Sequence, residues 1–506
     1  MEENMRKPLV CLCLTGKTID EDVRIAEEYI RYIDMVELRA DCLEEDERLN
    51  IRDFPSLVKV PCLLTIRRVA DGGKYEEGEA SRSMLFARAL AFADEDKRKN
   101  FAYVDFEDDF IVPGLQDAAL AFGTRIIRSF HDMNNPVKNI AQRLSKMRMT
   151  GFEIPKIAFM PKSLSDITDL FKEASALSGT EQIICAMSAF GLPTRVLAQR
   201  FNSYLSFTSP AELMENVKGL GHVDPVSLSS LYRFRSIDSE TRLFGITGFP
   251  LVATSSPKIH NTIFGENEMN AVYVPFKAEK AEEAFEFANT MGVCGFSVTV
   301  PHKETIIPLL DSVDKGVQEM GACNTVVRED GKWLGFNTDC IGFELAIKEF
   351  TGRDSLSGMK VSVIGAGGAA KAIVYALKNL GADACIFNRT SVKARKLAEK
   401  VGFNYSGLGS DCIMKLQSYS DLIVQTTSKG MNSTDEPNET NDPIWFYDFT
   451  GNELLYDIVY EPNVTPVMKR AAAAGCRVAN GLSMLRYQGE EQARIFRKAY
   501  EKSFDD

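Results

Sequence analysis

Eight strand-like apolar runs alternate with helix-like segments over the first 234 residues of this 506-residue chain. Between the runs, apolar residues recur at helical spacing, as Val23, Ala26 and Ile30 do after the first run. Eight regular βα units predict an α/β fold of the (β/α)8 TIM-barrel type, and a doubly wound sheet is the weaker alternative. The runs occupy residues 9–15, 35–41, 62–67, 101–107, 124–131, 154–160, 182–188 and 203–209.

Composition limits the classes of function. The length suggests about three domain-sized units, and a net charge of −12 argues against nucleic acid as the main partner. Eleven scattered cysteines without a CxxC pair fit a reducing compartment, and no apolar run is long enough for a signal peptide or a membrane span. We therefore expect a cytoplasmic protein without a membrane partner. Four dispersed histidines indicate no metal site.

Polar residues gather at the C-terminal ends of the predicted strands, where such barrels carry their reactive groups. Lys156 interrupts an apolar run. Either its head group reaches water or a carboxylate, or it is desolvated and acts as a nucleophile. A neutral lysine forms an imine with a ketone, and a nearby histidine such as His131 can then move the protons of a dehydration. Arginines at the same end would hold a substrate carboxylate.

These residues resemble type I 3-dehydroquinate dehydratase over about residues 8–234, through the segments ELRAD, TIR, YVDFE, SFHDM and IPKIAFMPKS. The resemblance implies that Lys156 is the Schiff-base lysine and His131 the general acid/base. Asp71 stands where the family has the glutamate expected to orient this histidine. Lys218 and His222 replace a serine and a glutamine that contact substrate. The implied substrate-binding residues are Glu37, Arg39, Arg67, Arg195, Lys218 and His222.

A glycine fingerprint marks the second half, after a polar stretch at 235–241 and an α/β region that extends to about residue 345. An apolar strand runs into Gly365-x-Gly367-x-x-Ala370 and a helix follows, the context of a Rossmann-type dinucleotide site. The next strand ends in Asn388-Arg389-Thr390 without an acidic residue, so Arg389 and Lys393 would attract a 2′-phosphate and favour NADP over NAD. The alternative is that Arg389 is a surface turn residue. The expected cofactor contacts here are Gly365, Ala366, Gly367, Gly368, Ala369, Ala370, Asn388, Arg389, Thr390 and Lys393.

The region before the fingerprint carries groups suited to the reduction of a ketone. Lys303 follows a strand, and Asp339 lies in the segment GFNTD. Hydride transfer to a ketone develops an alkoxide, which a lysine beside an aspartate can stabilise and protonate. An ordinary ion pair is the alternative. Thr254 and Ser256 offer hydroxyls just before a helix that Pro257 can begin.

Together these segments resemble shikimate dehydrogenase over about residues 242–500, with further matches at TTSKGM, YDIVYEPNVTP and GLSMLRYQ. The resemblance implies that Lys303 and Asp339 are the catalytic pair and that Ile458 and Gly481 lie near the nicotinamide. Ser297 stands where the family has asparagine and leaves room for a bulkier ring substituent. The implied substrate contacts are Thr254, Ser256, Thr299, Asn324, Tyr460 and Gln488.

The two resemblances support each other, because the product of the first reaction is the substrate of the second. We expect a bifunctional shikimate-pathway enzyme of aromatic amino acid biosynthesis, monomeric, with small-molecule partners only. The alternatives are a quinate/shikimate dehydrogenase with a weakened dehydratase half and a non-catalytic metabolite-sensing homologue. The predicted domains are 1–234 (barrel), 235–241 (linker), 242–345 (substrate binding), 346–482 (NADP binding, Rossmann) and 483–506 (a C-terminal helix returning to the catalytic domain).

Overall fold

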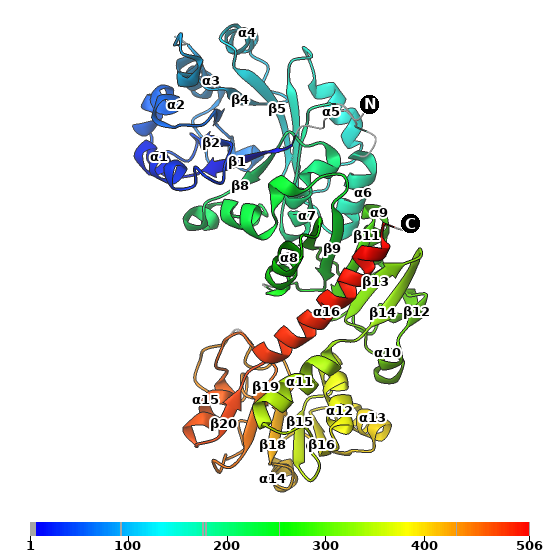
Figure 1. Ribbon diagram of the computed structural model, residues 1–506. Helices are drawn as coiled ribbons and strands as arrows, with labels where there is room; N and C mark the ends of the chain where they lie inside the picture. Colours follow the sequence, from blue (N-terminus) through cyan, green and yellow to red (C-terminus); the bar gives the residue numbers. More distant parts are fainter. Residues whose placement is uncertain are drawn as a thin grey trace. The chain divides into compact units, whose positions relative to one another are not determined.

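The computed structural model describes residues 7–91, 94–174, 177, 180–251, 254–431 and 433–504 (Figure 1). The chain divides into two compact units, Met1–Val293 and Cys294–Asp506. Among the described residues, no helix combines the length and apolar character needed to cross a bilayer.

The first unit contains an eight-stranded parallel sheet in the order β7-β6-β5-β4-β3-β2-β1-β8. An isolated parallel bridge between Gln182 and Ser203 joins the two ends of this order, so the sheet forms a nearly closed barrel. The barrel prediction is confirmed. The strands are β1 (Leu9–Leu14), β2 (Met35–Arg39), β3 (Cys62–Thr65), β4 (Tyr103–Glu107), β5 (Arg125–Asp132), β6 (Ile154–Phe159), β7 (Ile183–Ala186) and β8 (Leu205–Thr208).

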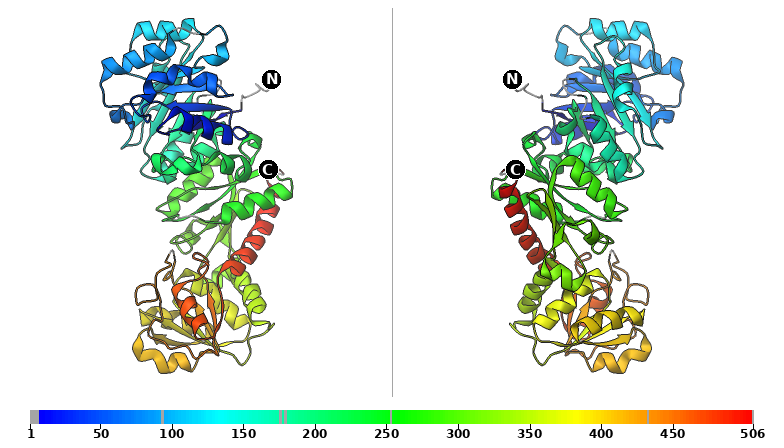
Figure 2. Two further views of the ribbon diagram at one scale, coloured as in Figure 1. Left: turned by 90° about the vertical axis from the view of Figure 1, so that its left-hand side faces the viewer. Right: turned by 90° about the vertical axis from the view of Figure 1, so that its right-hand side faces the viewer.

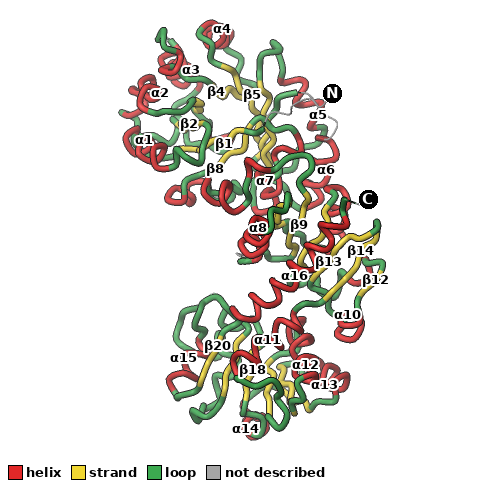
Figure 3. The backbone as a smooth tube through the Cα atoms, viewed as in Figure 1, coloured by secondary structure: helices red, strands yellow, loops and turns green. Residues whose placement is uncertain are grey.

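Helices lie outside the barrel strands, as Figure 3 shows. Alternation along each strand sends one set of side chains to the helices and the other to the interior. Ile154 and Ala158 of β6 belong to the interior cluster, so Lys156 between them points inward as well. The helices are α1 (Ile19–Glu28), α2 (Phe54–Leu57), α3 (Glu79–Leu90), α4 (Pro113–Ala121), α5 (Ile140–Met147), α6 (Leu164–Ala174) and α7 (Leu192–Val196).

The first unit continues beyond the barrel into a strand–helix–strand–helix segment. β9 (Arg242–Thr247) and β10 (Ala271–Pro275) pair in parallel, and α8 (Ser256–Glu266) connects them. α9 (Ala281–Met291) follows and packs on α6, where the rings of Phe171 and Phe287 meet with centroids 6.3 Å apart. This contact fixes the added segment to the outside of the barrel.

The second unit contains two sheets. In the first, β11, β13, β14 and β12 lie in this order, and β13 runs antiparallel to both of its neighbours. The second is parallel, in the order β17-β16-β15-β18-β19-β20, the arrangement expected of a Rossmann-type fold. The strands are β11 (Val293–Val298), β12 (Ser312–Val313), β13 (Thr325–Glu329), β14 (Lys332–Phe336), β15 (Lys360–Ile364), β16 (Asp383–Asn388), β17 (Asn404–Gly407), β18 (Leu422–Gln425), β19 (Leu454–Asp457) and β20 (Arg477–Ala479).

The last helix links the two sheets of the second unit. α16 runs from the end of β20 to β13, as Figures 1 and 2 show. It packs on α11 at Gly342, where an added Cβ would lie 2.7 Å from the Cβ of Gln488. The close approach therefore requires glycine. The helices are α10 (Lys315–Met320), α11 (Asp339–Thr351), α12 (Gly368–Asn379), α13 (Ser391–Val401), α14 (Ile413–Gln417), α15 (Pro466–Ala473) and α16 (Leu482–Lys502).

A buried carboxyl group supports the loop between β1 and α1. Asp22 is fully buried, and its Oδ1 accepts a hydrogen bond of 2.9 Å from the amide of Gly16. Its Oδ2 has no partner among the described residues. Burial raises the pKa of Asp22 to about 7, although the Gly16 amide opposes the change.

We predict that Asp22→Asn makes unfolding less dependent on pH. The folded pKa lies above the ordinary value of 3.8. Asp22 therefore makes its full contribution to the free energy of unfolding only below about pH 4. This contribution is lost as the pH rises through 7, because the buried carboxyl group ionises. Between pH 4.5 and pH 8, the free energy of unfolding of Asp22→Asn should rise by on the order of a few kcal/mol relative to that of the parent. Thermal unfolding midpoints at these pH values measure the gain.

Asp20→Asn is the matched control, because Asp20 is an exposed carboxylate on the same helix. It should leave the pH dependence of the unfolding midpoint unchanged. Equal slopes for the parent and Asp22→Asn would contradict the prediction.

Candidate active sites

Lys156 lies at the centre of the barrel interior with 5% of its surface exposed. Its Nζ donates a hydrogen bond of 2.9 Å to Oδ2 of Asp105 on β4. It also lies 4.5 Å from the ring centroid of Phe207 on β8. The lysine is therefore paired with a buried carboxylate and does not extend to the surface.

Asp105 joins several positive groups in the interior. Arg67 lies 2.8 Å from the same Oδ2, and Ser129 on β5 donates to Oδ1. Burial opposes ionisation, but the charges of Arg67 and Lys156 outweigh it and hold the pKa of Asp105 well below its usual range. The carboxylate is thus charged and can hold an ammonium group.

Arg67 continues a chain of buried charges away from Asp105. Its Nη1 donates 2.7 Å to Oε1 of Glu107 on β4 and 3.0 Å to the hydroxyl of Ser129. The other oxygen of Glu107 accepts 2.8 Å from Nη1 of Arg82 on α3. Alternating charge allows these groups to remain ionised inside the protein, because each carboxylate has a cation on either side.

His131 of β5 faces the same interior. Burial lowers the pKa of His131 well below its ordinary value, and the positive charges of Arg67 and Lys156 add to the effect. Its buried Nδ1 has no hydrogen-bond partner among the described residues. Asp71, expected to orient this ring, accepts 2.7 Å from Nε of Arg68. The histidine is neutral at physiological pH and can accept a proton.

Two more predicted residues form pairs within the mouth of the barrel. Glu37 is buried and accepts 2.7 Å from the hydroxyl of Thr65. Arg39 makes a two-point contact with Asp41, at 2.9 and 2.8 Å. These pairs fix both side chains before any ligand binds.

Arg195 on α7 retains unused donors. It is 2% exposed, and its Nη2 donates 3.0 Å to the carbonyl of Leu220. Its buried Nε and Nη1 have no partner in the part of the chain that the structure describes. Guanidinium N–H groups that have no protein partner are suited to donate to a carboxylate.

The loop after β8 places its two predicted residues differently. The Nδ1 of His222 lies 2.6 Å from the hydroxyl of Ser209, and burial together with the charge of Arg195 lowers the pKa of His222 well below its usual range. Lys218 lies at the surface, 78% exposed, with its Nζ 3.1 Å from Glu215. The structure thus brings His222 to the cluster and leaves Lys218 outside it, and a role for Lys218 stays a prediction.

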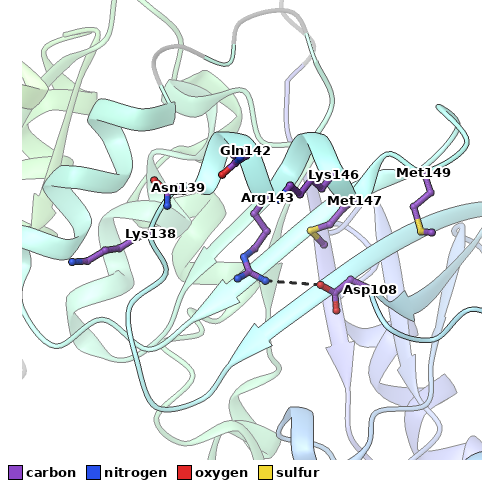
Figure 4. Close-up of a pocket in the computed structure, with 8 residues that line it drawn as sticks. All are labelled: Asp108, Lys138, Asn139, Gln142, Arg143, Lys146, Met147 and Met149. Carbon is purple, nitrogen blue, oxygen red and sulfur yellow. Dashed lines mark ion pairs between the residues drawn. The ribbon is translucent and has the colours of Figure 1, made fainter.

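A surface cavity of about 370 Å³ lies beside α5 and is separate from the predicted residues (Figure 4). Arg143 and Asp108 face each other across it at 3.9 Å. Its lining residues are Asp108, Lys138, Asn139, Gln142, Arg143, Lys146, Met147 and Met149.

The second unit brings together Lys303, Asp339 and Asn324. The Nζ of Lys303 pairs with Oδ2 of Asp339 at the start of α11, and Nδ2 of Asn324 donates 2.8 Å to Oδ1. Asn324 also donates 3.0 Å to the hydroxyl of Thr338, which lies 3.4 Å from Oε1 of Gln488 on α16. A lysine and a carboxylate in contact can pass a proton to an adjacent oxygen.

The other predicted substrate contacts lie in three places. Thr299 directly follows β11, and Tyr460 follows β19. Thr254 and Ser256 belong to the first unit, where their hydroxyls are 3.2 Å apart at the start of α8. Their joint role in one substrate site stays a prediction.

The glycine fingerprint forms the turn between β15 and α12. Gly365 has φ +116°, and an added Cβ there would lie 2.5 Å from Oγ1 of Thr426. An added Cβ at Gly367 would meet no atom within 4 Å, and one at Gly368 would meet only the Cδ of Lys303. Ala369 and Ala370 continue the first turn of α12. This turn leaves backbone amides open at a helix N-terminus, where a pyrophosphate binds.

The remaining predicted cofactor residues lie at neighbouring strand ends. Arg389 and Lys393 are exposed after β16, and Asn388 donates 3.0 Å to the carbonyl of Thr390. Gly481 approaches Ile458 so closely that an added Cβ would lie 2.0 Å from the Ile458 carbonyl oxygen. Ile458 and Gly481 are therefore adjacent, and their place near the nicotinamide stays a prediction.

Sequence reasoning missed three partners of the predicted residues. Thr65 and Ser209 orient Glu37 and His222, and Arg82 binds Glu107. A signal existed for Arg82, because it shares a helix face with Phe86 and Ala89 at spacings of four and seven. A charged residue on a buried face indicates a buried partner.

We predict that His131 titrates with a midpoint below 6.5, its ordinary value. Burial and neighbouring cations favour the neutral ring, so protonation requires lower pH. Proton–carbon NMR of the histidine rings across pH 4–8 measures the midpoint, and His131→Gln assigns the signal among four histidines. A midpoint above 6.5 would contradict the prediction.

Comparison with known proteins places this geometry in a family. The model for "Type I 3-dehydroquinase" matches residues 10–239. The model for "Shikimate dehydrogenase substrate binding domain" matches residues 246–326, and that for "Shikimate / quinate 5-dehydrogenase" matches residues 344–448. The three matches include the barrel residues, Lys303, Asn324 and the glycine fingerprint, whereas Asp339 lies between the second and third matches.

Individual relatives agree with the family models. The "Shikimate dehydrogenase (NADP(+))" of Aquifex aeolicus is 38% identical over 51% of this chain and 93% of its own. A solved shikimate dehydrogenase in complex with NADP+ is 31% identical over 53% of this chain and 96% of its own, with a TM-score of 0.46. The "Bifunctional 3-dehydroquinate dehydratase/shikimate dehydrogenase, chloroplastic" of Arabidopsis thaliana is 30% identical over 96% of this chain and 82% of its own. The chain belongs to the family of bifunctional 3-dehydroquinate dehydratase/shikimate dehydrogenases.

Proposed function

We propose that the barrel dehydrates 3-dehydroquinate to 3-dehydroshikimate through an imine on Lys156, and that the second half reduces this product to shikimate with NADPH. The observation that carries the proposal is the buried contact between Lys156 and Asp105, beside a neutral His131. We also propose that the activities divide at the predicted bounds, with the barrel in 1–234 and the dehydrogenase in 242–506.

The dehydration begins when Lys156 passes a proton to the neutral His131 and its amine attacks the ketone carbon. His131 returns that proton to the hydroxyl of the adduct, which leaves as water, and the protonated imine that forms acidifies the neighbouring C–H bond. His131 removes that proton, and returns it to the departing hydroxyl group, which leaves as water. Another water then hydrolyses the imine and releases the product. Asp105 holds the ammonium group in place between turnovers.

Arg195 supplies the anchor for the substrate carboxylate in this proposal. Its unpaired Nε and Nη1 would donate hydrogen bonds to the substrate carboxylate. Glu37, Arg39, Arg67 and His222 would bind the ring hydroxyls, since their own partners already fix their positions. Lys218 would contribute only if its surface loop approached the ligand.

The dehydrogenase site uses Lys303 and Asp339 as its proton-donating pair. When bound, NADPH supplies the hydride. Lys303 would donate a proton to the carbonyl oxygen, and Asp339 holds the ammonium group at that position. Asn324 and Gln488 lie in the same hydrogen-bond network and would bind ring hydroxyls. Thr254, Ser256, Thr299 and Tyr460 complete the proposed substrate contacts.

The residues at the fingerprint fit NADP. The open space at Gly367 and the strained φ of Gly365 suit a phosphate against the N-terminus of α12. Arg389 and Lys393 are exposed where a 2′-phosphate would lie, and no acidic side chain ends β16. The names of the related dehydrogenases, which specify NADP(+), agree with this choice.

We predict that borohydride, added in the presence of 3-dehydroquinate, leaves a ligand covalently bound to Lys156. Reduction of the imine makes a stable adduct, which peptide mass spectrometry locates. Lys156→Met should abolish the adduct and the dehydration, yet retain reduction of 3-dehydroshikimate. Lys162→Met, which removes an exposed lysine just after β6, is the control and should leave the adduct unchanged.

The same preparation tests the whole proposal when it receives 3-dehydroquinate and NADPH. Shikimate is the expected product. Quinate would mean that the second half reduces 3-dehydroquinate directly, and turnover without an adduct would refute the imine. No turnover of either substrate would support the metabolite-sensing alternative.

We predict that Arg389→Gln weakens NADP more than NAD. A charge-assisted contact to phosphate is worth about 1.5–3 kcal/mol, so KM for NADP should rise about 10- to 100-fold while KM for NAD changes little. Lys396→Gln is the control, because it removes an exposed charge from α13, the helix that begins just after Arg389. An unchanged KM for NADP would assign Arg389 to the surface turn alone.

A further inference from the structure

Arg82 is a buried arginine with no role in the reactions proposed above. It lies on α3, outside the barrel strands, yet its surface is fully buried. Its guanidinium lies 4.5 Å from the ring centroid of Phe110. Burying such a charge costs several kcal/mol unless opposite charges and hydrogen bonds offset the desolvation. The contacts of Arg82 therefore show what holds it in place.

Arg82 pairs with Glu79 on its own helix at 3.1 Å, and its other two polar contacts lead to Arg67. One Nη1 donates 2.8 Å to Oε2 of Glu107 and 2.9 Å to the carbonyl of Ile66, the residue before Arg67. Oε1 of the same Glu107 receives the hydrogen bond from Arg67 at 2.7 Å. Arg82 thus holds both the backbone next to Arg67 and the carboxylate that orients its side chain.

The chain then reaches the reactive lysine in two more contacts. Arg67 lies 2.8 Å from Oδ2 of Asp105, and Lys156 donates to that same oxygen at 2.9 Å. Four contacts, each between opposite charges, therefore connect α3 with Lys156. Each carboxylate in the series is shared between two cations.

We propose that Arg82 is a positioning residue of the dehydratase, which holds Arg67 through Glu107 and so fixes how Asp105 is shared with Lys156. The inference rests on the proposed imine chemistry. Without Arg82, Glu107 would draw Arg67 toward itself, and Asp105 would be left to Lys156 alone. The loss of one cation would also leave excess negative charge near the lysine and favour its ammonium form, which cannot attack a ketone.

Other ionisable groups face the same interior and contribute to the electrostatic environment of Lys156. They come from four of the barrel strands, from α7 and from the loop after β8. They are Cys11, Glu37, Arg39, His131, Cys185, Arg195 and His222.

The test compares Arg82→Met with Arg88→Met, which removes an exposed arginine from the same helix. The full-length protein is used, and oxidation of shikimate with NADP+ by the other half serves as an internal control for folding. Arg82→Met should lower kcat of the dehydratase about 10- to 100-fold, the range expected for a misplaced reactive group. KM should change less than kcat, and Arg88→Met should change neither.

The pH dependence of borohydride trapping separates positioning from general support of the fold. In Arg82→Met, the midpoint of the trapping rate should move to higher pH, because more of the lysine is protonated. Arg82→Met/Glu107→Gln removes the charge pair as a unit and should return the midpoint toward that of the parent. Arg82→Lys should recover part of kcat, since it keeps the charge without the planar fork.

Two outcomes would overturn the inference. One is a lower thermal midpoint with an unchanged pH profile of trapping in Arg82→Met. The other is a trapping midpoint of Arg82→Met/Glu107→Gln that lies no closer to the midpoint of the parent than that of Arg82→Met does. If Arg82→Met does not fold, Arg82→Lys and the double variant decide by the same measurements. Failure of the parent to form any adduct would instead refute the imine proposal itself.

Discussion

The shared carboxylate of Asp105 is the interaction on which the barrel site depends. Lys156 of β6 and Arg67, which follows β3, contact one of its oxygens, and Ser129 of β5 donates to the other. A buried lysine without such a partner would be strongly destabilising. The carboxylate therefore allows β6 to carry a lysine in an apolar interior, and the closed sheet gives the three strands the spacing that these contacts need.

Much of the architecture follows from apolar patterning alone. Apolar runs predicted each barrel strand to within a few residues, because parallel strands covered on both faces carry nearly continuous apolar sequence. The same reasoning marked Lys156 as an exception within its run. At the fingerprint, Gly365 could be predicted because its φ of +116° admits almost no other residue. The family relation agrees with the predicted barrel and with the predicted dinucleotide site.

Long side chains account for most of what the sequence could not supply. Periodicity shows which face of a helix is buried, but it does not show how far an arginine reaches, so the contact of Arg82 with Glu107 stayed hidden. Lys218 was expected at the ligand, but the structure places it at the surface beside Glu215. Asp71, shorter than glutamate, pairs with Arg68. In each case, the partner that a side chain contacts depends on how far the side chain extends and on which neighbouring groups compete for it. No sequence pattern encodes these two factors.

The closure of the barrel between β7 and β8 has a consequence for its motions. Among the described residues, an isolated parallel bridge from Gln182 to Ser203 joins the two ends of the sheet, whereas β6 forms ladders of six residue pairs with β5 and four with β7. Local stability is lowest where backbone pairing is sparse. Arg195 and His222 follow the two strands at this seam, whereas Lys156 and Asp105 lie in the continuous part of the sheet. The barrel can therefore open more readily beside Arg195 and His222 than in the ladders around Lys156 and Asp105.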